Sequence, residues 1–364
     1  MTGPRPVLFD VVRDRLRRDR WELTRPFLPT QERPDGADFL LHRPSWIPDD
    51  PVPLDSVRLR WSGQDTGSDP RIDPRIDRAR RRAGELVPFE PATGPGETYS
   101  GAIRRREHRD DLTDHLSYRL LRVDDDDGRG PVLSFGTAGY FDMLDTTLVL
   151  EYEAASGGRR YRTWLGDPFD LTVRAANPGV VVLTLVRGRA GPRFMSHRRA
   201  GTGTYPHSTH LVPAGEFQPI DRSPRSVERD LDVWSTICRE YAEEFLGHPD
   251  ATGSAGWSID WSRAEPYRTL QEARRSGGIR VLYLGCGLDP LTWKPDLLVV
   301  CVVDDAVHRR VFPGVDELST VEGRIVDEPF TEEVVARHLS GSETLASARA
   351  ALSLAWRRRD VILG

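Results

Sequence analysis

Three carboxylates stand close together in the run from Arg239 to Gly247, whose sequence is Arg-Glu-Tyr-Ala-Glu-Glu-Phe-Leu-Gly. At about 3.6 residues per turn, a helix through this run places Glu240, Glu243 and Glu244 within about one third of its circumference. Like-charged side chains one turn apart repel each other by a few tenths of a kcal/mol. Arginines, solvation or a divalent cation relieve such repulsion, and a hard cation such as Mg²⁺ takes carboxylate, water and phosphate oxygens together.

A strand and a tight turn are predicted ahead of this helix. Residues 209–212 are extended and mostly apolar, and Pro213-Ala214-Gly215 supplies the turn. The helix itself is predicted over 226–247, because its apolar residues recur at helical spacing and form a buried stripe. The glutamates project from the other side of that stripe. The order is therefore strand, glycine turn and acidic helix.

This order resembles the Nudix box. The family pattern is Gly, five residues, Glu, seven residues, then Arg-Glu-U-x-Glu-Glu-x-Gly-U, where U is a bulky aliphatic residue. The chain has the four charged identities between Arg239 and Glu244. It departs elsewhere: Gly215 lies ten residues farther from Arg239 than in the pattern, Leu231 replaces the first Glu, and Gly247 stands one position late.

Nudix proteins are metal-dependent hydrolases of nucleoside diphosphates linked to another group. The resemblance thus implies Mg²⁺ or Mn²⁺, with Glu243 and Glu244 as metal ligands. It implies Glu240 as a third carboxylate, acting as a ligand or as the general base, and Arg239 as the side chain that holds this carboxylate through a bidentate pair. The family often adds an acid from a later loop, for which Glu322 is the candidate.

Three further residues are candidates for contacting the substrate. Gly215 allows a close turn beside the helix, and its amide can face a phosphate. Trp293 and Lys294 have the chemistry to stack on and pair with a nucleotide, although a tryptophan ahead of a buried strand is more often part of the core. His207 and His210 have ligand-like spacing, but no third ligand accompanies them.

Two functions fit these residues. One is the hydrolase, acting on a nucleoside-diphosphate-linked or related pyrophosphate. The other is a Nudix-like module that binds such a metabolite without turnover, and the chain looks similar to regulator-associated Nudix-like sequences of high-GC bacteria. Losing the glutamate at Leu231 weakens the support of the metal ligands, which is typically worth about 10–100-fold in affinity or activity. Three clustered carboxylates without a metal are unfavourable, and this consideration favours the hydrolase.

Composition narrows the class of protein. The chain has 364 residues, 38% of them hydrophobic, and a net charge of −5, which gives no global field for nucleic acid. Lys294 is the only lysine, so individual arginines carry no functional signal. Three scattered cysteines, in apolar runs without Cys-x-x-Cys spacing, indicate buried thiols in a reducing cytoplasm. We expect a cytoplasmic protein whose partner is a small nucleotide derivative rather than a membrane or nucleic acid; a homodimer stays open.

The periodicity predicts an α/β (α+β) fold in three parts. Residues 1–95 form a loop-rich segment with a short amphipathic helix in 1–25, residues 96–175 a small α+β segment, and residues 176–364 a Nudix-like α/β/α sandwich with a mixed sheet. No regular element is expected from Pro26 to Pro95, and Arg78–Arg82 are expected to face solvent. Strands are expected at 116–123, 131–135, 180–186, 193–199, 281–285 and 297–303, and helices at 146–155 with Asp145 as N-cap, 226–247, 265–277, 331–339 and 347–357.

Overall fold

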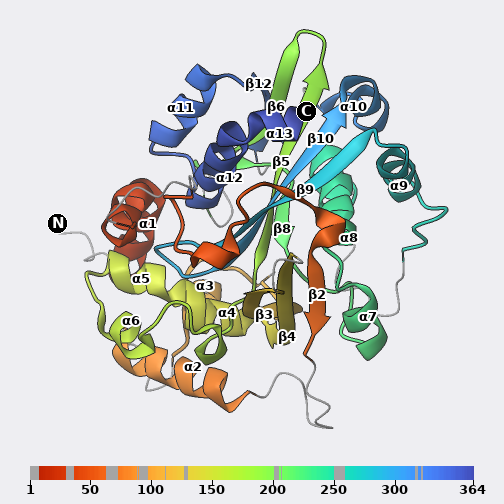
Figure 1. The fold of residues 1–364 in the computed structure, drawn as a ribbon. Helices are drawn as coiled ribbons and strands as arrows, with labels where there is room; N and C mark the ends of the chain where they lie inside the picture. The colour runs from red at the N-terminus through yellow and green to blue at the C-terminus, as the bar shows by residue number, and fades with distance from the viewer. Residues whose placement is uncertain are drawn as a thin grey trace.

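A mixed sheet with helices on both of its faces forms the centre of the molecule (Figure 1). A computed structural model describes residues 8–29, 37–62, 73–87, 89, 97–110, 112–126, 130–200, 205, 207–249, 259–315, 319–320 and 323–364. Within these ranges the predicted class, α/β with a mixed sheet, is confirmed. No helix of the described ranges is long and apolar enough to cross a membrane.

The central sheet has the order β1-β9-β10-β5-β6-β12-β11 along the described chain, with β8 paired to β5 and β7 to β6. Its strands are β1 (Val52–Pro53), β5 (Gly179–Gly188), β6 (Gly191–Arg199), β7 (Thr209–Leu211), β8 (Ala214–Glu216), β9 (Ile279–Leu288), β10 (Pro295–Asp304), β11 (Ser319–Thr320) and β12 (Gly323–Pro329). Strands β5 and β10 run parallel, and the other pairs are antiparallel.

Strands β5 and β6 diverge beyond their shared hairpin. They pair with each other only next to their hairpin, from Leu185↔Phe194 to Gly188↔Gly191. Beyond that point β8 pairs with β5 and β7 pairs with β6, so the two short strands occupy the space between the diverging strands. The predicted hairpin at 188–191 is confirmed. The turn that was expected to position the acids therefore lies inside the sheet.

Helices cover both faces of this sheet. On one face lie α11 (Glu332–Ser340), α12 (Ala346–Arg357) and α13 (Arg359–Leu363), with α12 against β5 and β10. On the other lie α8 (Val233–Glu240), α9 (Tyr267–Arg275) and α10 (Asp305–Val311), preceded by α7 (Pro224–Arg229). Two apolar cores follow from this arrangement, one on each face. The three cysteines are buried and free, as expected, and all of them lie in the core that contains α8 and α9.

The N-terminal half adds a second sheet and a helical cluster. The sheet has the order β2-β4-β3, formed by β2 (Arg58–Trp61), β3 (Leu116–Asp125) and β4 (Pro131–Gly139). The helices are α1 (Leu8–Thr24), α2 (Pro74–Leu86), α3 (Tyr99–Arg106), α4 (Tyr140–Met143), α5 (Val149–Ala155) and α6 (Arg160–Leu165), which enclose a third core. This cluster packs below and beside the central sheet (Figure 1).

Three expectations for this half were wrong. The stretch from Pro26 to Pro95 contains β2 and α2, because Asp73 caps the Arg75 amide and Pro74 occupies the first helical turn, where a proline is well tolerated. Arg80 of α2 does not simply face solvent, since it forms ion pairs with the buried Asp142 and Asp145. Asp145 is not an N-cap; it lies inside a helical turn and accepts hydrogen bonds from the Ser100 amide and hydroxyl.

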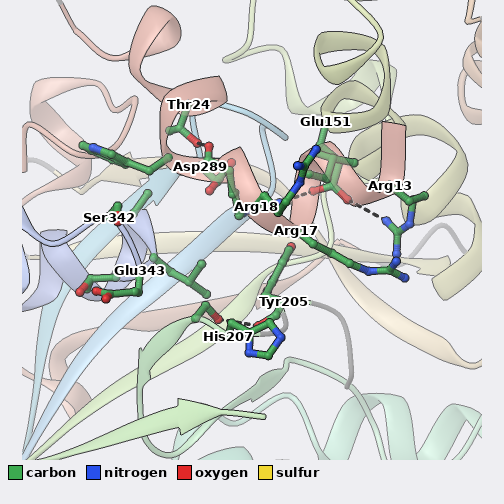
Figure 2. A pocket seen from close by; sticks show the side chains of 17 residues that line it. Arg13, Arg17, Arg18, Thr24, Glu151, Tyr205, His207, Asp289, Ser342 and Glu343 are labelled. Atoms are coloured by element: carbon green, nitrogen blue, oxygen red, sulfur yellow. Dashed lines mark hydrogen bonds and ion pairs between the residues drawn. The ribbon is translucent and has the colours of Figure 1, made fainter. Parts of the chain in front are cut away.

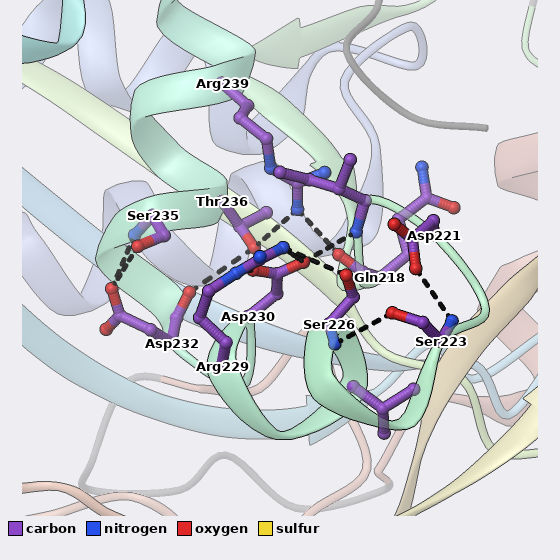
Figure 3. Close-up of polar contacts among 12 residues, drawn as sticks. Gln218, Asp221, Ser223, Ser226, Arg229, Asp230, Asp232, Ser235, Thr236 and Arg239 are labelled. Carbon is purple, nitrogen blue, oxygen red and sulfur yellow. Dashed lines mark hydrogen bonds and ion pairs between the residues drawn. The ribbon is translucent and has the colours of Figure 1, made fainter. Parts of the chain in front are cut away.

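The long helix predicted over 226–247 is also interrupted. Helix α7 ends at Arg229, and α8 begins at Val233 with Asp232 as its N-cap (Figure 3). The Asp232 carboxylate accepts from the Ser235 amide at 2.9 Å, and the Asp230 carboxylate accepts from the Ile220 amide at 2.9 Å. Aspartates compete for backbone amides in this way, which stops one helix and starts the next. One π-helical turn, Tyr241–Phe245, then continues α8.

We expect that replacing the Asp232 cap will destabilise the fold. Asp232→Ala leaves the Ser235 amide without its acceptor, so the free energy of unfolding should fall by about 1 kcal/mol in urea denaturation. Glu228→Ala, on an exposed position of α7, is the control and should change stability by less than about 0.5 kcal/mol. Equal effects from the two variants would show that Asp232 does not act as a cap.

Candidate functional site

Two of the predicted acids contact strand β8. The Glu240 carboxylate occupies the space where a side chain at position 215 would begin, since a Cβ there would lie 2.0 Å from Glu240 Cδ. Glu244 Oε2 accepts a hydrogen bond from the Ala214 amide at 2.9 Å. Glu243, between them in sequence, is exposed. The structure therefore brings the predicted turn and the predicted acids together, and Gly215 is required by close packing.

Arg239 has a different role from the one predicted. Instead of the expected carboxylate pair, its Nη2 donates to the Gln218 carbonyl oxygen at 2.6 Å and to Thr236 Oγ1 at 3.2 Å (Figure 3). Its side chain is 5% exposed, and Nη1 is buried without a hydrogen-bond partner in the described part of the chain. Leu231, at the position of the family's first glutamate, lies outside α8 and packs on the core. Arg239 thus ties α8 to the segment that follows β8.

The predicted acids do not form an all-protein cage within the described ranges, where no three His, Cys, Asp or Glu side chains come together as a metal-binding group. Mg²⁺ keeps several waters and commonly takes only one or two carboxylates together with substrate phosphates. Glu240 and Glu244, which contact neighbouring residues of β8, are the two acids that could hold such a cation. Glu322, the further predicted ligand, lies outside the described residues.

A second group of charged residues lies on the opposite face of β8. A Cβ at Gly179 would lie 2.5 Å from Asp296 Oδ1 and 2.7 Å from Lys294 Nζ, and Gly179 pairs directly with Glu216. Directly opposed residues of an antiparallel pair share a face, and successive residues alternate between faces. Glu216, Lys294 and Asp296 are therefore on one face of β8, and Glu240 is on the other.

This second group lines a cavity of about 170 Å³. Lys294 Nζ lies 3.4 Å from Asp296 Oδ1, and Glu216 accepts from Ser117 Oγ at 2.7 Å with His115 Nε2 at 3.5 Å. Burial alone would raise the pKa of Glu216, but the hydrogen bond and charge of His115 and the charge of Lys294 hold it below its ordinary value. The Gly215 backbone also lines this cavity, so the two groups meet at that residue.

Trp293 lies in the core instead of at either group. Its side chain is 5% exposed, and its ring faces the guanidinium groups of Arg162 and Arg174 at 4.8 and 5.5 Å. His207 and His210, which follow each other closely in sequence, also separate, because His207 is exposed while His210 is buried. Among the predicted substrate-binding residues, Gly215 and Lys294 therefore line the cavity, and Trp293 stabilises the core.

Sequence reasoning missed several residues of the cavity. Glu216 directly follows Gly215, and Asp296 stands two residues after Lys294, which is the spacing that puts two strand residues on one face. That alternation was the available signal for Asp296. His115 and Ser117 carried no local signal, because they reach Glu216 from strand β3 and the residue before it, about a hundred positions earlier in the chain.

Comparison with known proteins gives a weak likeness to one class of structure. No family profile and no curated protein matches the chain. A solved NUDIX hydrolase from Alicyclobacillus acidocaldarius is 15% identical, covering 51% of this chain and 95% of its own, with a TM-score of 0.31. A mutT/nudix family protein from Listeria innocua is 15% identical, covering 52% of this chain and 98% of its own, with a TM-score of 0.28. At these TM-scores and sequence identities the likeness is weak, concerns the fold alone and assigns no activity.

The contact between Gly215 and Glu240 predicts a specific coupling. Gly215→Ala forces the Glu240 carboxylate away from β8 and should lower the free energy of unfolding by about 1–3 kcal/mol. The double variant Gly215→Ala/Glu240→Ala should lose less free energy of unfolding than the two single variants lose in sum. The reason is that Glu240→Ala removes the carboxylate that the added methyl group would meet. Gly188→Ala on β5, where the nearest atoms to a Cβ lie at 3.7 Å, is the matched control and should be milder. Additive effects at Gly215 and Glu240 would contradict the contact.

Proposed function

We propose that the chain is a divalent-metal-dependent hydrolase of a nucleoside-diphosphate-linked or related pyrophosphate substrate. The single observation that supports this proposal is the position of the Glu240 carboxylate directly against the Gly215 backbone, with Glu244 bound to the neighbouring Ala214 amide. These two contacts fix the Glu240 and Glu244 carboxylates beside β8, where they can face a cation that is also bound by a substrate phosphate. The proposed cation is Mg²⁺ or Mn²⁺.

The residues have distinct roles in this proposal. Glu240 and Glu244 hold the cation, and the exposed Glu243 adds negative charge one turn away. When bound, the cation neutralises phosphoryl oxygens and lowers the pKa of a coordinated water. Glu240 is also the proposed proton acceptor, since its half-buried carboxylate keeps a fixed position against β8. Arg239 acts as a positioning residue, because it anchors α8 through the Gln218 carbonyl oxygen.

Binding without turnover is the second candidate function, and one observation favours it. Arg239 Nη1 is buried without a partner in the described chain, and the position that would supply a glutamate is Leu231. An arginine at position 239 that lacks a carboxylate partner gives the proposed metal ligands on the same helix weaker support. The same acids would then recognise a metal-bound diphosphate without cleaving it.

A substrate screen separates the two functions. Purified protein is incubated with nucleotide sugars, dinucleoside polyphosphates, NAD and ADP-ribose in the presence of Mg²⁺ or Mn²⁺, and product formation is followed by chromatography. We expect turnover of at least one diphosphate, and a fall of about 100-fold or more in the Glu243→Gln/Glu244→Gln variant, because the cation loses the ligand Glu244 and the nearby negative charge of Glu243.

The control removes the same amount of charge elsewhere. Glu228→Gln/Glu272→Gln changes two exposed glutamates on α7 and α9 and should keep the parent's rate. Metal-dependent binding without any turnover, lost in the Glu243→Gln/Glu244→Gln variant, would support the second function. Neither binding nor turnover with any of these compounds would overturn both.

A further inference from the structure

Arg199 lines the cavity beside β8, and its side chain is half-buried. Among the described residues, its enclosed Nε has no hydrogen-bond partner and no carboxylate forms an ion pair with its guanidinium. Two buried histidines have a lowered pKa, His197 at about 4 and His210 at about 3, first because of burial and then because of the charge of Arg199. A buried polar group without a partner costs free energy, and a charged one costs more.

The other two cations of this cavity already have partners. Arg20 Nη1 lies 2.6 Å from Glu151 Oε2, and Lys294 Nζ lies 3.4 Å from Asp296 Oδ1. Glu216, on the same wall, is held by His115 and Ser117. Arg199 is therefore the lining cation without an ion-pair partner among the described residues, and Asp289 is a lining carboxylate without one. A singly charged carboxylate suits Arg199 better than a doubly charged anion, because the carboxylates of Asp296 and Asp289 repel a second negative charge.

Polar atoms beside Arg199 add to this site. The His210 Nδ1 lies 2.9 Å from the Leu211 carbonyl oxygen, so Nδ1 carries the proton and Nε2 is an acceptor. Ser347 Oγ lies 3.5 Å from that Nε2, in the first turn of α12. Its hydroxyl donates or accepts as a ligand requires. The histidine stays neutral and so adds no second positive charge.

A larger cavity adjoins this one. Arg20, Tyr205, Asp289 and Leu345 line both cavities, and the Arg20 guanidinium lies over the Tyr205 ring at 4.1 Å. The larger cavity has a volume of about 320 Å³ and lies between α1 and the segment 342–346 (Figure 2). Its apolar lining includes Leu16, Trp21 and Ala346. The pair of cavities thus offers a charged end and a wider, partly apolar end.

We propose that these adjoining cavities together bind a small organic monocarboxylate, whose carboxylate pairs with Arg199 and whose apolar or planar body extends past Arg20 and Tyr205 toward Trp21. A guanidinium and a carboxylate form paired, charge-assisted hydrogen bonds, which would give the half-buried Arg199 a charged partner. The site lies on the face of β8 opposite Glu240, so it does not rest on the proposed hydrolase. It is a site for a second kind of ligand.

Three matched probes test the charge requirement. The full chain is titrated with 4-fluorobenzoate, 4-fluorophenyl phosphate and 4-fluorobenzamide at millimolar concentration, and binding is followed by fluorine NMR. We expect 4-fluorobenzoate to bind most tightly, because it alone carries a single negative charge. Arg199→Met should weaken it about ten-fold or more, while Arg199→Lys, which keeps the charge, should weaken it less. Arg198→Met, at the exposed neighbouring position, should leave binding unchanged.

Two further measurements keep the proposal falsifiable. In the parent protein, 4-fluorobenzoate should shift the ring resonances of His210 but not those of the exposed His248, which decides the site even if an Arg199 variant fails to fold. Glu243→Gln/Glu244→Gln should bind the probe normally, whatever its effect on hydrolysis. Absence of binding, equal binding by Arg199→Met, or tighter binding of the phosphate or the amide would each overturn the proposal.

Discussion

The close contact between the Glu240 carboxylate and the Gly215 backbone is the constraint on which the rest of the site depends. It requires a residue without a side chain at position 215, and it requires α8 to end beside β8. Strand β8 reaches that place only because β5 and β6 separate beyond their hairpin and leave space between them. Arg239, bonded to the Gln218 carbonyl oxygen, fixes the helix at this distance. The short strand β8 therefore determines both the packing of α8 and the position of the proposed catalytic glutamate.

That strand also divides the charges. Because successive residues alternate between faces, Gly215 looks toward the acids of α8, whereas Glu216 looks toward Lys294 and Asp296. The short strand thus borders two polar environments with different partners. One contains the Glu240 and Glu244 carboxylates, which we propose hold a cation. The other contains charged pairs such as Lys294 with Asp296, together with Arg199, which has no ion-pair partner among the described residues.

How far the sequence predicted this arrangement depends on whether the signal was local. The contact of the turn with the acidic helix was predictable, since a strand, Gly215 and Glu240 follow one another in a known order. The break at Asp230–Asp232 was missed, because the apolar stripe continues across it from Val227 to Trp234 while the aspartates divert the backbone amides. Arg199 could not be singled out, because almost every cation is arginine and only the fold shows that Arg199 lines a cavity.

The single lysine of this sequence has a practical consequence once its position is known. Lys294 carries the only side-chain amine of the chain, and its side chain is 18% exposed in the wall of the cavity beside Asp296. An amine-reactive reagent small enough to enter therefore has one internal target, apart from the chain's own first amino group. The extent of acylation at that position reports directly whether the cavity is filled or open.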